Sequence, residues 1–311
     1  MRIDRRFLLT GAAAGLLTGC GKKAAPKPLP PKGPAQILER VLAGDWRTEA
    51  DRARDIWRHP AESLAFWGLK PGLTVVELWP GVGWYSDILA PYLEQTGGKL
   101  YAATQPPNEP QGPATEKMVN DYRRKMRSRK RLYGEVTFTE FGRNSGPLAP
   151  ADTADMVLFL RNIHNWMAGQ IAEKAFADAF AVLKPGGILG IEEHRAASDT
   201  VQDVLASSGY VQETFVMQLA SEAGFVMPQS SEINANLTDT KDHPFGVWTL
   251  PPTRASAPRG QPANPAFDHT RYDQIGESDR ITLRFIKPDP NAAPPPAPPS
   301  APPTKAEATK R

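Results

Sequence analysis

Two polar clusters follow apolar, strand-like segments and contain the residues best suited to acid–base chemistry. The first cluster follows residues 155–160 and contains Asn162 and His164. A histidine can accept a proton near neutral pH, so His164 is the first candidate for a general base. Asn162 or Asn165 would orient the group that loses the proton. The alternative for His164 is a capping or packing role in a loop between a strand and a helix.

The second cluster is Glu193-His194-Arg195, directly after residues 188–192. Ligands bind at the carboxyl ends of the strands in open α/β sheets, so both clusters would face the same edge. His194 is therefore a second catalytic candidate, against the alternative of a structural hydrogen-bond network. His59 and His243 could contribute from more distant segments. The spacing of these residues matches no metal motif, so no metal site is predicted.

A glycine-containing turn follows a third apolar segment, residues 73–79. The turn reads Pro80-Gly81-Val82-Gly83 and precedes a helical stretch at 84–95. Glycines after a strand let the backbone approach a nucleotide-like ligand where any Cβ would collide. Taken alone, two glycines in this position are a weak signal.

The segments that must position these residues alternate between strand-like and helix-like patterns. Strands are expected at 73–79, 99–104, 136–141, 155–160, 188–192, 225–234 and 279–287, and helices at 84–95, 114–132, 168–183 and 210–223. This alternation predicts a parallel sheet with right-handed crossovers. A Pro-rich stretch at 239–278 is expected to be either functional or disordered, because loops of this length are uncommon.

The N-terminus has the pattern of an export signal. Residues 1–19 combine a charged start with a short apolar run, and Leu17-Thr18-Gly19-Cys20 resembles a bacterial lipobox. The lipobox implies a lipid on Cys20, which would become the first residue of the mature chain. The alternative is a degraded signal anchor with an incidental cysteine. Arg5-Arg6 resembles a twin-arginine signal, whose pathway exports folded proteins and would allow a cofactor to be loaded before export.

One domain with extended ends is therefore expected. A Pro- and Lys-rich linker covers 20–34, the domain covers 35–287, and a Pro- and Ala-rich tail at 288–311 is expected to be disordered. Cys20 is the only cysteine in the chain, which excludes a disulfide or a cysteine nucleophile within one mature molecule.

Charge gives little indication of a macromolecular partner. The chain has 37 Lys and Arg against 34 Asp and Glu, a net charge of +3, so nucleic-acid binding is not expected. The one concentrated run of charge extends from Arg123 to Arg131 within an expected helix. Such a run is usually a solvated face, and in a membrane-tethered protein it could also contact anionic headgroups.

The glycine turn resembles motif I of class I S-adenosylmethionine (SAM) dependent methyltransferases. Glu77 stands at the acidic position of that motif. Gly81 and Gly83 match its second and third glycines, and Trp79 replaces the first. The chain also departs from the family at Thr104-Gln105, after the second strand, where the family usually has an acidic residue that binds the ribose.

Further segments carry the same resemblance in the family's order. They are Leu183-Lys184-Pro185-Gly186-Gly187, Ala223-Gly224-Phe225 and Phe285-Ile286-Lys287-Pro288. More narrowly, the segments 58–60, 239–244 and 276–280 resemble a little-characterised bacterial group of exported methyltransferases.

The resemblance implies a Rossmann-like α/β fold, with a mostly parallel seven-stranded sheet, an antiparallel last strand and helices on both faces. It implies SAM as the cofactor and a small-molecule or lipid-related acceptor methylated near His164. The cofactor-binding residues would be Glu77, Trp79, Gly81, Gly83, Thr104 and Gln105.

Two alternatives to a methyltransferase remain. The first is a non-catalytic lipoprotein that binds a nucleoside or SAM, which Trp79 and the missing ribose carboxylate favour. The second, a nicotinamide-dependent oxidoreductase, ranks last because the chain lacks a complete Gly-x-Gly-x-x-Gly motif. In either case the expected location is the periplasmic face of a membrane, with the outer membrane preferred because Gly21 and not aspartate follows Cys20.

Overall fold

A computed structural model describes residues 33–107, 109 and 112–291 of the chain. The expected signal segment 1–19, the lipidation site Cys20 and most of both Pro-rich ends lie outside these residues. No helix in the described ranges is long and apolar enough to cross a membrane.

Seven strands form one sheet, as the resemblance predicted. They are β1 (Thr74–Leu78), β2 (Lys99–Thr104), β3 (Thr137–Glu140), β4 (Ala154–Leu160), β5 (Leu183–His194), β6 (Val226–Ser231) and β7 (Arg280–Ile286). Their order across the sheet is β3-β2-β1-β4-β5-β7-β6. β1 to β5 pair in parallel, and β7 runs antiparallel to both β5 and β6. The Rossmann-like fold class is therefore confirmed.

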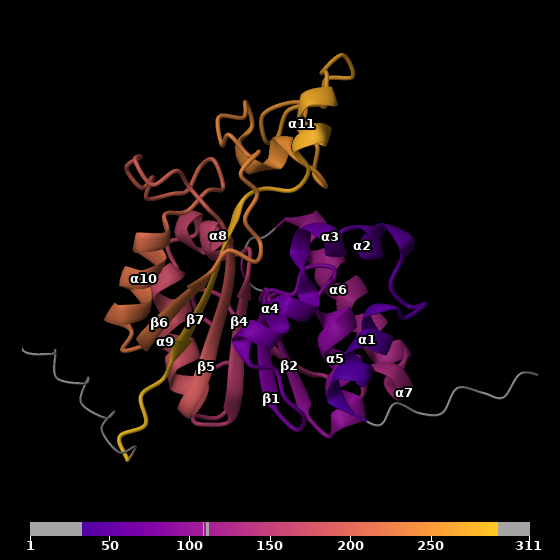
Figure 1. Cartoon of the computed structure of the whole chain (residues 1–311), viewed down its shortest axis with the longest axis vertical. Coiled ribbons are helices and arrows are strands. Elements are labelled where there is room, and N and C mark those ends of the chain that lie inside the picture. The colour runs from indigo at the N-terminus through magenta and orange to yellow at the C-terminus, as the bar shows by residue number, and fades with distance from the viewer. Residues whose placement is uncertain (1–32, 108, 110–111, 292–311) are drawn as a thin grey trace, which may run out of the picture. The chain divides into compact units, whose positions relative to one another are not determined.

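The helices connect these strands and cover both faces of the sheet (Figure 1). They are α1 (Pro34–Leu42), α2 (Glu49–Ala53), α3 (Asp55–Arg58), α4 (Pro60–Trp67), α5 (Ser86–Thr96), α6 (Pro113–Ser128), α7 (Lys130–Tyr133), α8 (Ile163–Ala168), α9 (Ala172–Val182), α10 (Glu213–Glu222), the 3₁₀ helix η1 (Gly246–Thr249) and α11 (Thr270–Ile275). The helix expected at 114–132 is divided at Arg129, whose φ of −130° and ψ of 52° are not helical. The helix expected at 168–183 begins only at Ala172, after the separate helix α8.

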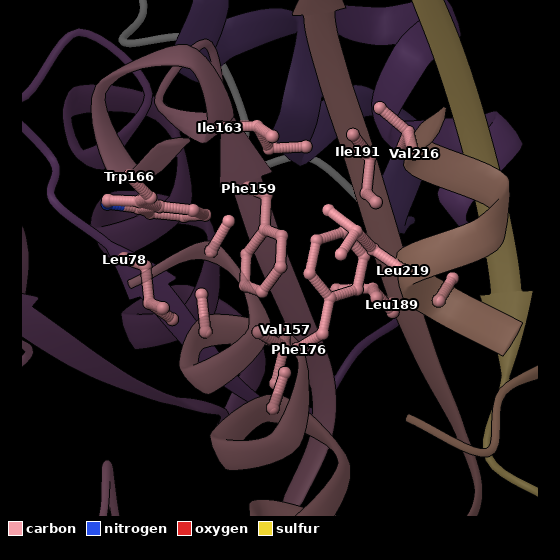
Figure 2. Close-up of a cluster of buried hydrophobic side chains, with 14 of the residues drawn as sticks. Leu78, Val157, Phe159, Ile163, Trp166, Phe176, Leu189, Ile191, Val216 and Leu219 are labelled. Atoms are coloured by element: carbon pink, nitrogen blue, oxygen red, sulfur yellow. The ribbon is translucent and has the colours of Figure 1, made fainter. Parts of the chain in front are cut away.

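Alternating residues of β4 face two different cores, as the pleat of a strand requires. Val157 and Phe159 join the core beneath α8, α9 and α10, which also contains Trp166 (Figure 2). Met156 and Leu158 join the core beneath α1, α4 and α5. Because both faces of this central strand are covered, the carboxyl edge of the sheet is the place left for a ligand.

The Leu183-Lys184-Pro185-Gly186-Gly187 segment lies inside β5 and not before it. β4 pairs with Leu183 and again from Ile188, so the residues between them form an irregularity in the ladder. Gly186 has a φ of 78°, a conformation that favours glycine. β5 therefore begins at Leu183, five residues before residue 188, where the pattern of apolar residues indicated its start.

The Pro-rich stretch 239–278 is folded at the carboxyl edge of the sheet, where it contains η1 and α11 (Figure 1). Asp239 fixes its beginning. The carboxylate of Asp239 accepts hydrogen bonds from the Tyr210 hydroxyl (3.0 Å) and from the Asp279 backbone N–H (2.8 Å), and it lies 2.8 Å from His243 Nε2. This segment therefore forms part of the wall above the strand ends.

Candidate functional site

His164 and Glu193 form a buried pair at the ends of β4 and β5. His164 Nδ1 lies 2.9 Å from Glu193 Oε1, and an ionised carboxylate only accepts, so Nδ1 is the donor. The other carboxylate oxygen accepts from the backbone N–H groups of Ile163 (2.6 Å) and His164 (3.3 Å). Glu193 thereby caps the N-terminus of α8, fixes the orientation of the imidazole and leaves Nε2 as its acceptor nitrogen.

His194 lies beside this pair, with its ring centroid 5.3 Å from that of His164. Its Nδ1 is 2.5 Å from the hydroxyl of Ser278. Burial lowers the pKa of His194 well below its ordinary value, and repulsion from His164 and Arg280 lowers it further. His194 is therefore neutral at neutral pH, which suits a hydrogen-bonding role beside His164 better than that of a cation.

The ligand atoms of His164, Glu193 and His194 all lie within 4.8 Å of one another. Two histidines and one carboxylate are a known ligand set for divalent metals. However, both oxygens of Glu193 already accept N–H groups, and arginines surround the cluster. These features oppose a dication, and the absence of a metal stays a prediction.

Four arginines from distant parts of the chain meet at this edge. Arg161 Nη1 donates to Glu192 Oε1 at 2.7 Å, and Arg280 Nε lies 3.5 Å from the same oxygen. Arg54 and Arg58 donate through Nε to the two oxygens of Glu277, at 2.6 and 2.9 Å. The cluster is therefore held together by two buried carboxylates shared between arginines.

Glu277 accepts hydrogen bonds from three of the four arginines, because Arg280 also donates to it. Burial by itself raises the pKa of this carboxyl, but Arg280, Arg58 and Arg54 together lower the pKa to about 2. Glu277 is therefore ionised throughout the physiological range.

The arginines and histidines line an open cavity of about 250 Å³. Its polar lining includes Arg54, Arg58, Arg161, Arg280, His164 and His194. Trp248, from η1, supplies an apolar wall and lies with its ring centroid 5.9 Å from that of His164. We refer to this space as the arginine cavity.

The glycine turn lies next to this site. Asn162 follows β4, and its side-chain nitrogen lies 3.0 Å from the backbone oxygen of Trp79 and 3.3 Å from that of Leu78. Its amide nitrogen is thus engaged in joining the ends of β1 and β4. Asn165 Nδ2 lies 3.5 Å from Asn162 Oδ1 and lines the arginine cavity, so Asn165 is better placed than Asn162 to contact a ligand there.

The two glycines of the turn have different surroundings, although both have positive φ. A Cβ at Gly81 would meet no atom within 4 Å, whereas a Cβ at Gly83 would lie 2.8 Å from the ring of Tyr122. Gly81 is open to the approach of a ligand. Gly83 is explained by the packing of α6 against the turn.

Glu77 faces inward from β1 and is buried. Its carboxylate accepts from the hydroxyl of Ser86 (2.6 Å), which also lies 2.9 Å from the hydroxyl of Tyr122. Burial raises the pKa of Glu77 to about 7, and the hydrogen bond from Ser86 opposes that rise. Glu77 supports the start of α5 through Ser86.

Trp79 adopts a left-handed φ of 48°, a conformation in which glycine is the residue normally favoured. Its indole nitrogen donates to the backbone oxygen of Phe141 (2.8 Å), and its ring packs at 6.0 Å from that of Trp166. The bulky side chain is thus accommodated in an aromatic cluster beside the turn.

Gln105 lines a second cavity, of about 410 Å³, between the end of β2 and α6. This volume is within the range of small-molecule sites. Thr104 is buried behind it, and its hydroxyl accepts from Arg123 Nη2 at 2.5 Å. Arg123 itself lines the cavity. The end of β2 therefore carries a contact between Thr104 and Arg123.

The structure thus divides the expected site residues between two cavities that have no lining residue in common. His164, His194 and Asn165 line the arginine cavity, Gln105 lines the larger one, and the glycine turn lies next to α8 through Asn162. His59 lies apart, with Nδ1 3.2 Å from Asn234 Oδ1, and His243 pairs with Asp239. The catalytic and cofactor roles of the expected residues stay predictions.

Sequence reasoning assigned no role to Arg54, Arg58, Glu277 or Arg280. The segments 58–60 and 276–280 had carried part of the family resemblance, and this was the one signal that could have directed attention to them. Their meeting depends on contacts between the two ends of the domain, such as that of Arg58 with Glu277, 219 residues apart.

Solved structures with a similar fold include several SAM-dependent methyltransferases. The [4+2]-cyclase SpnF is 15% identical, with 82% of this chain and 93% of that chain covered and a TM-score of 0.50. A SAM-dependent methyltransferase from Aquifex aeolicus is 22% identical, with 65% and 93% covered and a TM-score of 0.45. Phosphoethanolamine N-methyltransferase 2 from Haemonchus contortus, in complex with SAM, is 13% identical, with 83% and 60% covered and a TM-score of 0.48.

No family model and no curated protein sequence matches the chain. The likeness to SpnF, which is a cyclase by name, agrees with the Rossmann-like architecture and concerns the fold alone.

Proposed function

We propose that this protein is a SAM-dependent methyltransferase that methylates a small-molecule or lipid-related acceptor in the arginine cavity. One observation carries the proposal. The hydrogen bond from Asn162 to the backbone oxygen of Trp79 places the open glycine turn beside α8, which carries the His164–Glu193 pair. A place for a nucleotide-like cofactor and a candidate base are thereby adjacent at the carboxyl edge of the sheet, where such folds bind ligands.

The surroundings of Gly81 and Gln105 fit the cofactor. Gly81 has open space where a Cβ would be, so the backbone can be approached closely, and Gln105 borders a cavity of sufficient volume. Glu77 fits less well as a direct ligand, because its carboxylate is buried against Ser86. Its proposed role is to hold the start of α5 in place.

When bound, SAM would supply an electrophilic methyl group and, as its S–CH3 bond breaks, would leave as S-adenosylhomocysteine. The chain's own residues would prepare the acceptor. His164 Nε2 would take the proton from an acceptor O–H or N–H group as the new O–C or N–C bond forms, and Glu193 would stabilise the imidazolium through Nδ1. Asn165 and Trp248, which line the same cavity, would orient the acceptor.

Isothermal titration calorimetry of the full chain with SAM and S-adenosylhomocysteine tests the proposal. Gly81→Arg should abolish binding, because its side chain would enter the approach to the turn. Gly97→Arg is the matched control: Gly97 also has a positive φ and open space around its Cβ position, but it lies at the far end of α5. If the unaltered chain binds neither compound, and no ligand copurifies with it, the proposal is rejected.

A second candidate is a binding protein with this fold and no catalytic activity. The engagement of Glu77 by Ser86 and of Thr104 by Arg123 favours it, because these groups are then less available to a cofactor. Binding of S-adenosylhomocysteine that is unaffected by His164→Gln, with no methyl transfer to any acceptor in a cell extract, would support this candidate.

The location of the protein is also a proposal. The lipobox supports attachment to the periplasmic face of a membrane through Cys20, and metabolic labelling with a tritiated fatty acid, lost in Cys20→Ser, would test it. The basic run Arg123–Arg131, which spans the end of α6 and the start of α7, supports additional contact with the membrane surface. Arg124, Arg127 and Arg131 are exposed, whereas Arg123 and Lys125 are engaged with Thr104 and Asp87.

A further inference from the structure

The arginine cavity has an excess of positive charge in its wall. Four guanidinium groups line it, and Glu277 is the only carboxylate among its lining residues. Behind the wall, Glu192 pairs with Arg161 and Arg280, and Glu193 accepts N–H groups from His164 and α8. The four arginines therefore outnumber the three buried carboxylates beside them, and of these carboxylates only Glu277 lines the cavity.

The arginines also retain unused donors. Among the described residues, the guanidinium groups of Arg54 and Arg58 donate hydrogen bonds only through Nε, both to Glu277. Arg161 donates only through Nη1, to Glu192. None of their remaining Nη atoms is among the fully buried unpaired atoms of the described chain, so these donors reach accessible space although Arg58 itself is only 4% exposed.

Burying Arg58 is costly without a further anion. Burial lowers the pKa of Arg58 well below its ordinary value, repulsion from Arg161 lowers it further, and Glu277 only partly opposes the effect. A guanidinium nevertheless keeps its proton in proteins, so the repulsion is relieved best by negative charge placed between the arginines.

We propose that the arginine cavity binds an oxyanion, a phosphate or a carboxylate, carried by the methyl acceptor. The planar donor pairs of Arg54, Arg58 and Arg161 match the oxygens of such groups. The oxyanion would hold the acceptor with its reacting group toward His164, which lines the same cavity. The assignment of the ligand as acceptor rests on the proposed function, whereas oxyanion binding rests on the cavity alone.

The test uses the full chain without SAM. Inorganic phosphate, acetate and chloride are compared at equal ionic strength, by calorimetry and by the shift of the thermal unfolding midpoint. We expect phosphate or acetate, but not chloride, to bind and to raise the midpoint, and the stronger of the two identifies the oxyanion. Arg54→Gln, at a side chain that is 23% exposed, should weaken binding about tenfold or more, as loss of a charge-assisted hydrogen bond predicts.

Arg124→Gln is the matched control, because Arg124 carries the same charge on the exposed face of α6 and should leave binding unchanged. A second readout needs no variant: phosphate or acetate should protect Arg54, but not Arg124, from modification by phenylglyoxal, as located by mass spectrometry. Equal effects of all three anions, or equal protection of both arginines, would overturn the proposal. SAM binding without oxyanion binding rejects this inference only, and oxyanion binding without SAM binding rejects only the proposed function.

Discussion

The ring of Tyr122 packs against Gly83 so closely that a Cβ added to this glycine would lie only 2.8 Å from Tyr122 Cε2. Gly81, two residues earlier, also has a positive φ but meets no such neighbour. The two glycines of the turn therefore serve different purposes, one against α6 and one toward open space.

This difference is measurable as stability. Gly81→Ala should cost about 1–2 kcal/mol, from backbone strain alone. Gly83→Ala should cost about 1–3 kcal/mol more, because the new methyl group overpacks against Tyr122. Urea unfolding measures both values, and adding Tyr122→Ala should recover part of the second cost. Equal costs at the two positions would show that Tyr122 does not pack on the turn.

Glu77 should make the protein less stable as pH rises. Its pKa is about 7 in the folded chain against an ordinary 4.5, so between these values the folded state holds a proton that the unfolded state has lost. The free energy of unfolding should therefore fall across this range by about 3 kcal/mol from this group. Urea unfolding of the chain and of Glu77→Gln, followed from pH 4 to 8, gives the contribution as a difference. A difference that is constant across pH 4.5 to 7 would contradict the expectation.

Glu277, in contrast to Glu77, should make the protein less stable as pH falls. Its pKa is lowered to about 2 from 4.5, so the stability it contributes is present above pH 4.5 and is lost as pH falls toward 2. Glu277→Gln leaves Arg54, Arg58 and Arg280 without their shared carboxylate and should cost about 3–5 kcal/mol at pH 7.

The control for Glu277 is Glu232→Gln. Glu232 pairs with Arg195, and its side chain is 65% exposed, so its loss should cost no more than about 1 kcal/mol. Chemical denaturation at pH 7 distinguishes the two variants. Similar small losses for both would mean that Glu277 does not hold the arginines together.

The His164–Glu193 pair predicts a fixed tautomer. Because Glu193 accepts from His164 Nδ1, the neutral ring should carry its proton on Nδ1, which two-bond ¹H–¹⁵N correlation spectra at pH 8 report directly. Glu193→Gln should release this preference and also weaken the N-terminus of α8, whereas His194→Gln should leave the tautomer of His164 unchanged. A ring protonated on Nε2 in the unaltered chain would remove His164 as a base facing the cavity.

The sequence pattern indicated a strand at each of the seven positions. The run of apolar residues is clear in β1 and β4, which are buried almost throughout, whereas β3 and β6 contain no fully buried residue. The residues at which individual helices and strands begin and end were less predictable. The division between α6 and α7 at Arg129 involves neither proline nor glycine, and the early start of β5 depends on pairing of Leu183 with Ala154, which only the assembled sheet provides.

The candidate site was predictable only in part, for a related reason. Asn162 and His164 follow β4, and His194 is the last residue of β5. The rule that ligands bind at the carboxyl ends of strands located all three. Arg54 lies between α2 and α3, and Arg58 ends α3, before the first strand of the sheet. Glu277 belongs to the segment before β7. Their convergence depends on long-range contacts that leave no periodic signal in the sequence.

The position of β7 has a consequence for the order in which the protein can be completed. β7 is the last strand among the described residues, yet it lies between β5 and β6, so when β6 leaves the ribosome its neighbour has not yet been made. The facing edges of β5 and β6 are unpaired until residue 286 is available, and unpaired edges favour wrong association. Glu277 precedes this strand and Arg280 begins it, so a chain that stalls after β6 lacks both the complete sheet and the arginine cavity, and the pairing of β6 must wait for the synthesis of β7.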